Sequence, residues 1–161
     1  MKLNTFAFLF IAFFFSLTSI AQEKLDVFEI ARKGTAQQAL EIIKTDAKAF
    51  NTTNSNGFTP LILACYRGNN EVAKVLIENN CDLNTKSEMG TALMASIVKG
   101  NNEIASFLID KKADVNLTDA EGTTALMYAV QFKNIELVKL LLANNADKSL
   151  LDKKGKTAFE I

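Results

Sequence analysis

The side chains that could do chemistry in this chain are two cysteines and a set of carboxylates, because the sequence contains no histidine. Without histidine there can be no Ser-His-Asp or Cys-His arrangement and no histidine metal ligand. Cys65 and Cys81 are too few for a structural zinc site, and no glycine-rich loop of the phosphate-cradling kinds is present. We therefore expect no catalytic residue, no cofactor and no metal site.

The carboxylates show a regular spacing that favours a structural role over acid–base catalysis. Three aspartates each follow a cysteine or an alanine at nearly constant intervals: Asp82, Asp114 and Asp147. Aspartate side chains commonly accept hydrogen bonds from the backbone two residues later and so stabilise turns. The spacing predicts that these carboxylates shape the turns of a repeated unit.

Two further markers repeat in the same register. The first is Thr59-Pro60-Leu61, followed at intervals of 32, 33 and 33 residues by Thr91-Ala92-Leu93, Thr124-Ala125-Leu126 and Thr157-Ala158-Phe159. The second comprises Asn69-Asn70-Glu71, Asn101-Asn102-Glu103 and Asn134-Ile135-Glu136. Independent markers with one period indicate a repeat architecture.

Each unit is predicted to form two short helices. Thr59 can cap the first helix, with Pro60 at the first helical position, and Gly68 can end it in a left-handed conformation. Asn69 can cap the second helix, with Glu71 placed favourably for the helix dipole. The same roles are predicted for Thr91, Thr124, Thr157, Gly100, Asn101 and Asn134.

The second helices carry apolar residues at helical spacing, which predicts a buried face. These residues are Val72, Val75, Leu76, Ile104, Phe107, Leu108, Leu137, Leu140 and Leu141. A single helix pair cannot bury this face alone, so stability must come from stacking neighbouring units. Cys65 and Cys81 stand where alanine is usual, and they are either small buried residues or partners in a disulfide.

The segments from Gly57 to Cys65 and from Val72 to Asn84 resemble the ankyrin repeat. The segment from Asp26 to Gly34 resembles the entry repeat of that family, with a second helix expected around Gln37 to Lys44. The resemblance implies an all-α solenoid of about four repeats plus a C-terminal stub. The implied units are 25–56, 57–88, 89–121, 122–154 and a partial unit at 155–161, all within a domain spanning 22–161.

The sequence departs from the family pattern in several places. Ile62, Met94 and Met127 stand where the motif has histidine, so its local hydrogen bonds must be lost or replaced. One residue is missing before Thr91, which predicts a shorter hairpin tip, and Lys133 replaces the turn glycine, which predicts a strained or altered turn. The partial unit at 155–161 is either part of a longer chain or a minimal cap.

The resemblance implies that a partner protein docks on the concave side, on the tips and the exposed edges of the first helices. Aromatic, apolar and basic residues and one glutamine occupy those positions: Phe58, Tyr66, Arg67, Met89, Val98, Lys99, Gln131 and Phe132. Such residues either form a continuous interaction patch or fold back to fill gaps between the tips.

The N-terminal segment has the composition of a secretory signal peptide. Lys2 precedes an apolar run from Phe6 to Leu17, and Ser19-Ile20-Ala21 provides small residues for cleavage before Gln22. A membrane anchor is the alternative, but the run is shorter than the ~20 residues that span a bilayer. We therefore expect residues 1–21 to be removed and the rest to be periplasmic or secreted, in the manner of exported bacterial proteins, without membrane insertion.

Charge sets further limits on the partner. Removing Lys2 leaves 17 basic and 18 acidic residues, a net charge of −1, which gives no overall attraction for nucleic acid. The sequence thus favours a monomeric, non-catalytic adaptor that binds another protein. The alternative is an inhibitor, an immunity-type protein or a stabilising partner of an exported enzyme, including an accessory for envelope stress protection.

Overall fold

The helices within residues 26–161 come in four consecutive pairs, each joined by a tight turn. The computed structural model describes residues 26–161, and the predicted signal segment, residues 1–21, lies outside them. The pairs are α2 (Val27–Lys33) with α3 (Ala36–Thr45), α4 (Pro60–Arg67) with α5 (Asn70–Glu78), α6 (Ala92–Val98) with α7 (Asn102–Asp110), and α8 (Ala125–Gln131) with α9 (Ile135–Ala143).

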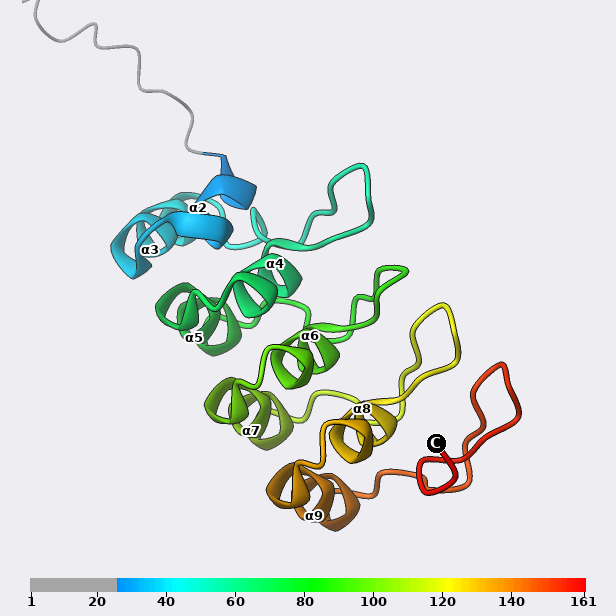
Figure 1. Ribbon diagram of the computed structural model, residues 1–161. Coiled ribbons are helices and arrows are strands. Elements are labelled where there is room, and N and C mark those ends of the chain that lie inside the picture. Colours follow the sequence, from blue (N-terminus) through cyan, green and yellow to red (C-terminus); the bar gives the residue numbers. More distant parts are fainter. Residues whose placement is uncertain (1–25) are drawn as a thin grey trace, which may run out of the picture.

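The pairs stack in two layers (Figure 1). Helices α2, α4, α6 and α8 form one layer, α3, α5, α7 and α9 form the other, and the loops between pairs project beside the first layer. The all-α solenoid predicted from the sequence is confirmed, including the entry pair α2 and α3.

Threonine caps start the first helices of the three inner units. The Thr59 side-chain oxygen accepts a hydrogen bond from the backbone N–H of Ile62 at 3.1 Å, and Pro60 occupies the first turn. Thr91 and Thr124 cap α6 and α8 in the same way. These caps satisfy backbone donors that would otherwise lack a partner, as predicted.

The prediction that Thr157 caps a further helix is wrong. Its hydroxyl donates to the carboxylate of Glu160 at 2.7 Å, and residues 158–160 form a turn. One backbone hydrogen bond closes this turn, from the N–H of Glu160 to the carbonyl of Thr157. A single turn has only the unfavourable nucleation step of a helix and lacks the propagation that stabilises one.

The apolar face of the second helices forms a continuous core along the stack. Leu76, Leu108 and Leu141 occupy equivalent positions in α5, α7 and α9, and each is fully buried. Phe107 and Leu140, predicted to be core, are only half-buried but pack against it. The predicted stripe is therefore confirmed, and its burial joins each repeat to the next.

The cap asparagines also connect neighbouring repeats. Asn134 accepts from the backbone N–H of Leu137 at 3.2 Å, while its amide donates to the side chain of Asn102 in the preceding repeat at 2.7 Å. Asn101 bonds Asn70 in the same way, and Asn69 donates to the carbonyl of Gly34 at 3.0 Å. Each cap therefore stabilises its own helix and the contact with the unit before it.

The regularly spaced aspartates shape turns, as predicted. The carboxylates of Asp82, Asp114 and Asp147 each accept from the backbone N–H two residues later, at 2.8 to 2.9 Å. Their own backbone N–H groups donate to an asparagine side chain of the preceding repeat, at 2.7 to 2.9 Å. Hydrogen bonding to the charged form lowers the pKa of Asp82, with Thr85 as the strongest contributor.

Two departures from the family motif, one in a tip and one within the first helices, have the predicted consequences. Ser87 and Gly90 exchange backbone hydrogen bonds of 3.0 Å and enclose a two-residue tip, one residue shorter than the tip from Asp119 to Thr123. Where the motif has histidine, Met94 and Met127 are buried, and the backbone N–H of Thr124 donates to the sulfur of Met127 at 3.4 Å.

Lys133 takes the left-handed conformation of the glycines it replaces. Its φ is 55°, compared with 74° at Gly68 and 72° at Gly100. A side chain in this region costs about 1–2 kcal/mol. The sequence predicted either a strained turn or an altered turn at Lys133, and the strained turn is observed.

Lys133→Gly is expected to raise the free energy of unfolding by about 1 kcal/mol, measured by urea denaturation, because glycine accepts this conformation without strain. The converse control is Gly100→Ala, where an added Cβ meets no atom within 4 Å. That control isolates the backbone effect and should destabilise the chain. A destabilising Lys133→Gly would show that this conformation is not a source of strain.

Candidate functional site: a groove across three repeats

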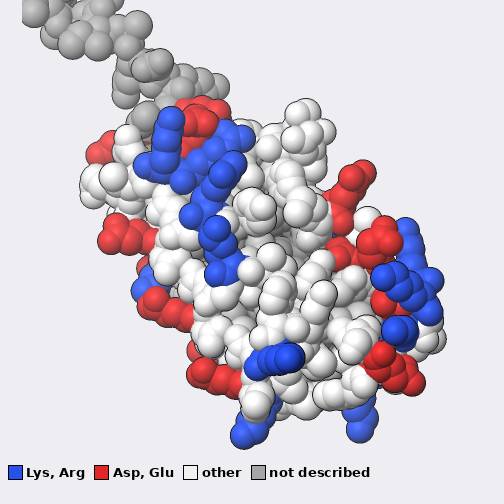
Figure 2. Space-filling view, in the orientation of Figure 1, with Lys and Arg blue, Asp and Glu red and all other residues white. Residues whose placement is uncertain are grey.

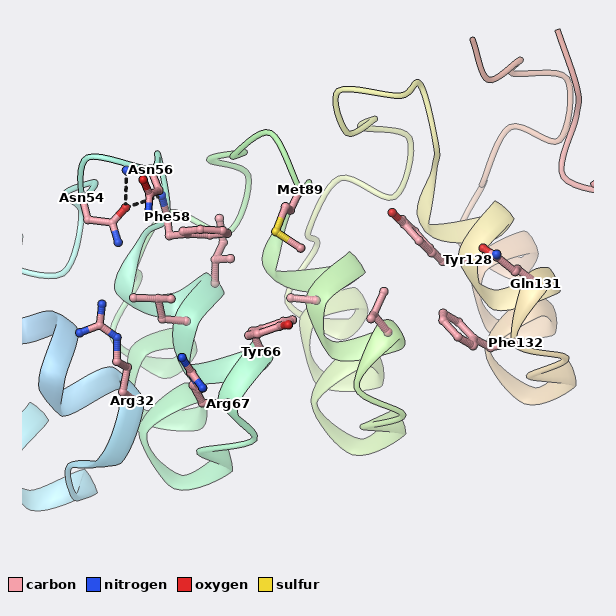
Figure 3. Close-up of a pocket in the computed structure, with 14 residues that line it drawn as sticks. Arg32, Asn54, Asn56, Phe58, Tyr66, Arg67, Met89, Tyr128, Gln131 and Phe132 are labelled. Atoms are coloured by element: carbon pink, nitrogen blue, oxygen red, sulfur yellow. Dashed lines mark hydrogen bonds between the residues drawn. The ribbon is translucent and has the colours of Figure 1, made fainter. Parts of the chain in front are cut away.

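A groove of about 480 Å³ crosses α4, α6 and α8 on the side of the projecting tips. It extends from Arg32 of α2 at one end to Phe132, the C-cap of α8, at the other. Figure 3 shows Tyr66 and Phe132 on the two sides of α6, with Met89 above it.

The floor of the groove is hollowed at its centre by a small residue. Leu63, Ala95 and Tyr128 occupy equivalent positions on α4, α6 and α8, and all three line the groove. Alanine is much smaller than leucine or tyrosine. At this position α6 therefore leaves space open, whereas α4 and α8 carry large side chains.

Seven of the eight residues predicted to face a partner line this groove. They are Phe58, Tyr66, Arg67, Met89, Val98, Gln131 and Phe132. The eighth, Lys99, does not line it, but its ammonium lies 5.9 Å from the centre of the Tyr66 ring. The structure thus brings together side chains from three repeats and shows the space between them, which the sequence analysis could not predict.

Of the two alternatives predicted for the apolar side chains, exposure is observed for four residues and inward packing for Phe58. Tyr66, Met89, Val98 and Phe132 are 42%, 59%, 41% and 51% exposed. Phe58 is half-buried and packs against the core. Asn54 orders the tip that carries Phe58, because its side-chain oxygen accepts from the backbone N–H groups of Asn56 and Phe58 at 3.0 Å (Figure 3).

Cations lie over the aromatic surface of the groove. The guanidinium of Arg67 is 6.0 Å from the centre of the Tyr66 ring, so this ring is approached by both Arg67 and Lys99. Cation–π attraction of this kind contributes about 0.5–1 kcal/mol at exposed sites. These contacts restrain the basic groups beside the groove.

Seven lining residues were absent from the sequence prediction, and two of them, Arg32 and Tyr128, add charge or aromatic surface to the groove. Arg32 comes from the entry repeat, and Tyr128 lies one turn before Phe132, with the two rings stacked at 6.4 Å. The i, i+4 spacing of these aromatics on one helix was a usable signal for Tyr128. The Tyr128 hydroxyl donates a hydrogen bond to Asp119 at 2.7 Å. Burial is the largest cause that raises the pKa of Tyr128 to about 12, and the Asp119 carboxylate is the second.

The cysteines are buried, free thiols, so the small-residue alternative is observed and the disulfide is not. Burial raises the pKa of Cys65 to about 12, and burial with the nearby Asp82 charge raises that of Cys81 to about 11. At neutral pH both are therefore protonated, and a thiol is a much weaker nucleophile than a thiolate.

Two other properties of residues 26–161 bear on the site. No three side chains of the types that bind metals are grouped closely enough there to hold an ion. In the same part of the chain, no helix has the length and apolar character needed to cross a membrane.

Comparison with known proteins identifies the repeats. Residues 27–119 match the family described as ankyrin repeats (3 copies), and residues 108–161 match ankyrin repeats (many copies). The ankyrin repeat and SAM domain-containing protein 6 of Danio rerio is 34% identical over 62 residues, which cover 38% of this chain and 8% of that relative. Because the first match alone covers more than half of the sequence, the chain belongs to the ankyrin repeat family, whose repeats generally mediate protein–protein interaction and are typically non-catalytic.

Proposed function

We propose that this chain is an exported, non-catalytic binding module that holds a partner protein in the groove across α4, α6 and α8. The observation that carries the proposal is the convergence of exposed Tyr66, Val98 and Phe132, from three different repeats, on one hollow. Tyrosine and arginine are frequent hot-spot residues, and exposed apolar side chains grouped on one face mark interaction sites.

Capture from the native envelope fraction tests the proposal. The tagged chain is compared with a Tyr66→Ala/Phe132→Ala variant, which removes exposed rings without opening the core. Ile135→Ala/Leu151→Ala is the matched control, because those side chains are at least as exposed and do not line the groove. We expect one protein to be captured by the wild type and the control and lost from the groove variant.

Equal capture by all three chains would contradict a binding role for the groove. If the captured partner is an enzyme, its activity with and without this chain distinguishes an adaptor from an inhibitor, an immunity-type protein or a stabilising partner.

Export is the second part of the proposal and is supported by sequence alone. The apolar run from Phe6 to Leu17 and the small residues before Gln22 have the composition of a cleavable signal. We expect N-terminal sequencing of the protein recovered from the envelope or the medium to begin at Gln22. An intact Met1 on the recovered protein would contradict cleavage.

A further inference from the structure

We infer that the groove accepts an extended peptide segment with acidic side chains near α4 and α6 and an apolar side chain near α8. This inference rests on the proposed function and specifies the chemistry of the partner.

The acidic preference comes from a basic row, defined as Lys33, Arg67 and Lys99. These residues stand at equivalent positions, at or just after the ends of α2, α4 and α6. Figure 2 shows basic side chains gathered over these three helices and acidic side chains along the opposite edge of the stack, while the tips carry both charges.

Two cations of the row are available to a ligand. Glu29 pairs with Arg32 at 2.6 Å and with Lys33 at 2.9 Å, which neutralises part of the α2 end. Arg67 and Lys99 form no ion pair within residues 26–161. No carboxylate of that part of the chain lines the groove, so a carboxylate ligand meets attraction there without local repulsion.

The apolar preference comes from the next repeat, where an aromatic residue stands at the position that continues the basic row. Phe132 occupies on α8 the position that Arg67 and Lys99 occupy on α4 and α6. Its ring stacks on Tyr128, and the hollow over Ala95 lies beside that pair. An apolar ligand side chain can bury its surface there.

The spacing of the helices fits an extended chain. Packed helices lie about 9 Å apart, and an extended chain in the polyproline II conformation advances about 3.1 Å per residue, with three residues per turn. Every third residue of such a segment therefore faces the next repeat. The matching pattern is two acidic residues three positions apart, with an apolar residue three positions further on.

A peptide is favoured over single-stranded nucleic acid by the extent of the charge. Nucleic-acid grooves follow a backbone of successive phosphates with many cations. Here the basic row comprises three residues, an apolar ring follows it on α8, and the chain as a whole has a formal net charge of zero.

The test is fluorescence anisotropy with labelled peptides of about nine residues, the length that crosses α4 to α8. One peptide carries Glu, Glu and Phe at three-residue intervals, a second replaces both Glu by Lys, and a third replaces Phe by Ser. We expect the first to bind about tenfold more tightly than either of the others, with affinity that falls as NaCl rises.

Charge reversal in the protein provides the matched experiment. Arg67→Glu/Lys99→Glu should shift the preference toward the Lys peptide, whereas Lys139→Glu, an exposed site on α9 away from the groove, should leave the preference unchanged.

Several outcomes would overturn the inference. They are equal or tighter binding of the Lys peptide, displacement of the acidic peptide by a thymidine oligonucleotide at lower concentration than by unlabelled peptide, and no binding of any peptide. The proposed function is tested separately, because capture lost from the Tyr66→Ala/Phe132→Ala variant can occur whatever the charge preference.

Discussion

Leu108→Ala is expected to lower the free energy of unfolding by about 2–5 kcal/mol, measured by urea denaturation. Leu108 is fully buried in α7, within the continuous core that joins one repeat to the next. Alanine removes buried apolar surface and leaves a cavity, and a repeat protein depends on such interfaces for its stability.

Leu142→Ala provides the control for Leu108, because the same substitution is then made on a side chain that is 39% exposed. Its effect should be well under half as large. Equal destabilisation by the two substitutions would contradict the assignment of α7 and α9 to this register.

Asn134→Ala is expected to destabilise the chain by about 1–3 kcal/mol. The substitution removes the cap on the backbone N–H of Leu137 and the bond to Asn102 in the preceding repeat. Thermal or urea unfolding measures the loss.

Asn134→Asp separates the two roles of this side chain. Aspartate keeps the acceptor that caps α9 but lacks the amide donor toward Asn102, so its cost should lie between zero and that of alanine. Asn56→Ala, at an exposed tip, serves as the neutral control. If Asn134→Ala were as mild as Asn56→Ala, the inter-repeat bond would contribute nothing to stability.

The fold was predictable because its signals are local and repeated. Threonine caps the first helix of a unit and asparagine caps the second, each by accepting a hydrogen bond from the backbone N–H three residues later. Both interactions involve only neighbouring residues. The period then relates each unit to the next, so the helix order and the core stripe follow from the sequence. Thr157 is the exception, because its single turn lacks the continuation that the other units provide.

Half of the residues that line the groove could be predicted from the sequence, but the shape of the groove could not. The family resemblance placed Tyr66 and Phe132 on the exposed edges of the first helices, and both are exposed. The hollow over Ala95 depends on the side chains of α4 and α8 on either side of it, which are more than 30 residues away in the sequence. Phe58 packs against the core, an outcome that its residue type and position alone did not distinguish from exposure.

The central claim is that the groove is the binding surface. The most direct test measures the affinity of the captured partner for the purified chain and for the Tyr66→Ala/Phe132→Ala variant, by isothermal titration calorimetry. Loss of two hot-spot rings predicts a Kd about thirtyfold higher for the variant, with the Ile135→Ala/Leu151→Ala control unchanged. Equal Kd values for the wild type and the groove variant would contradict the claim.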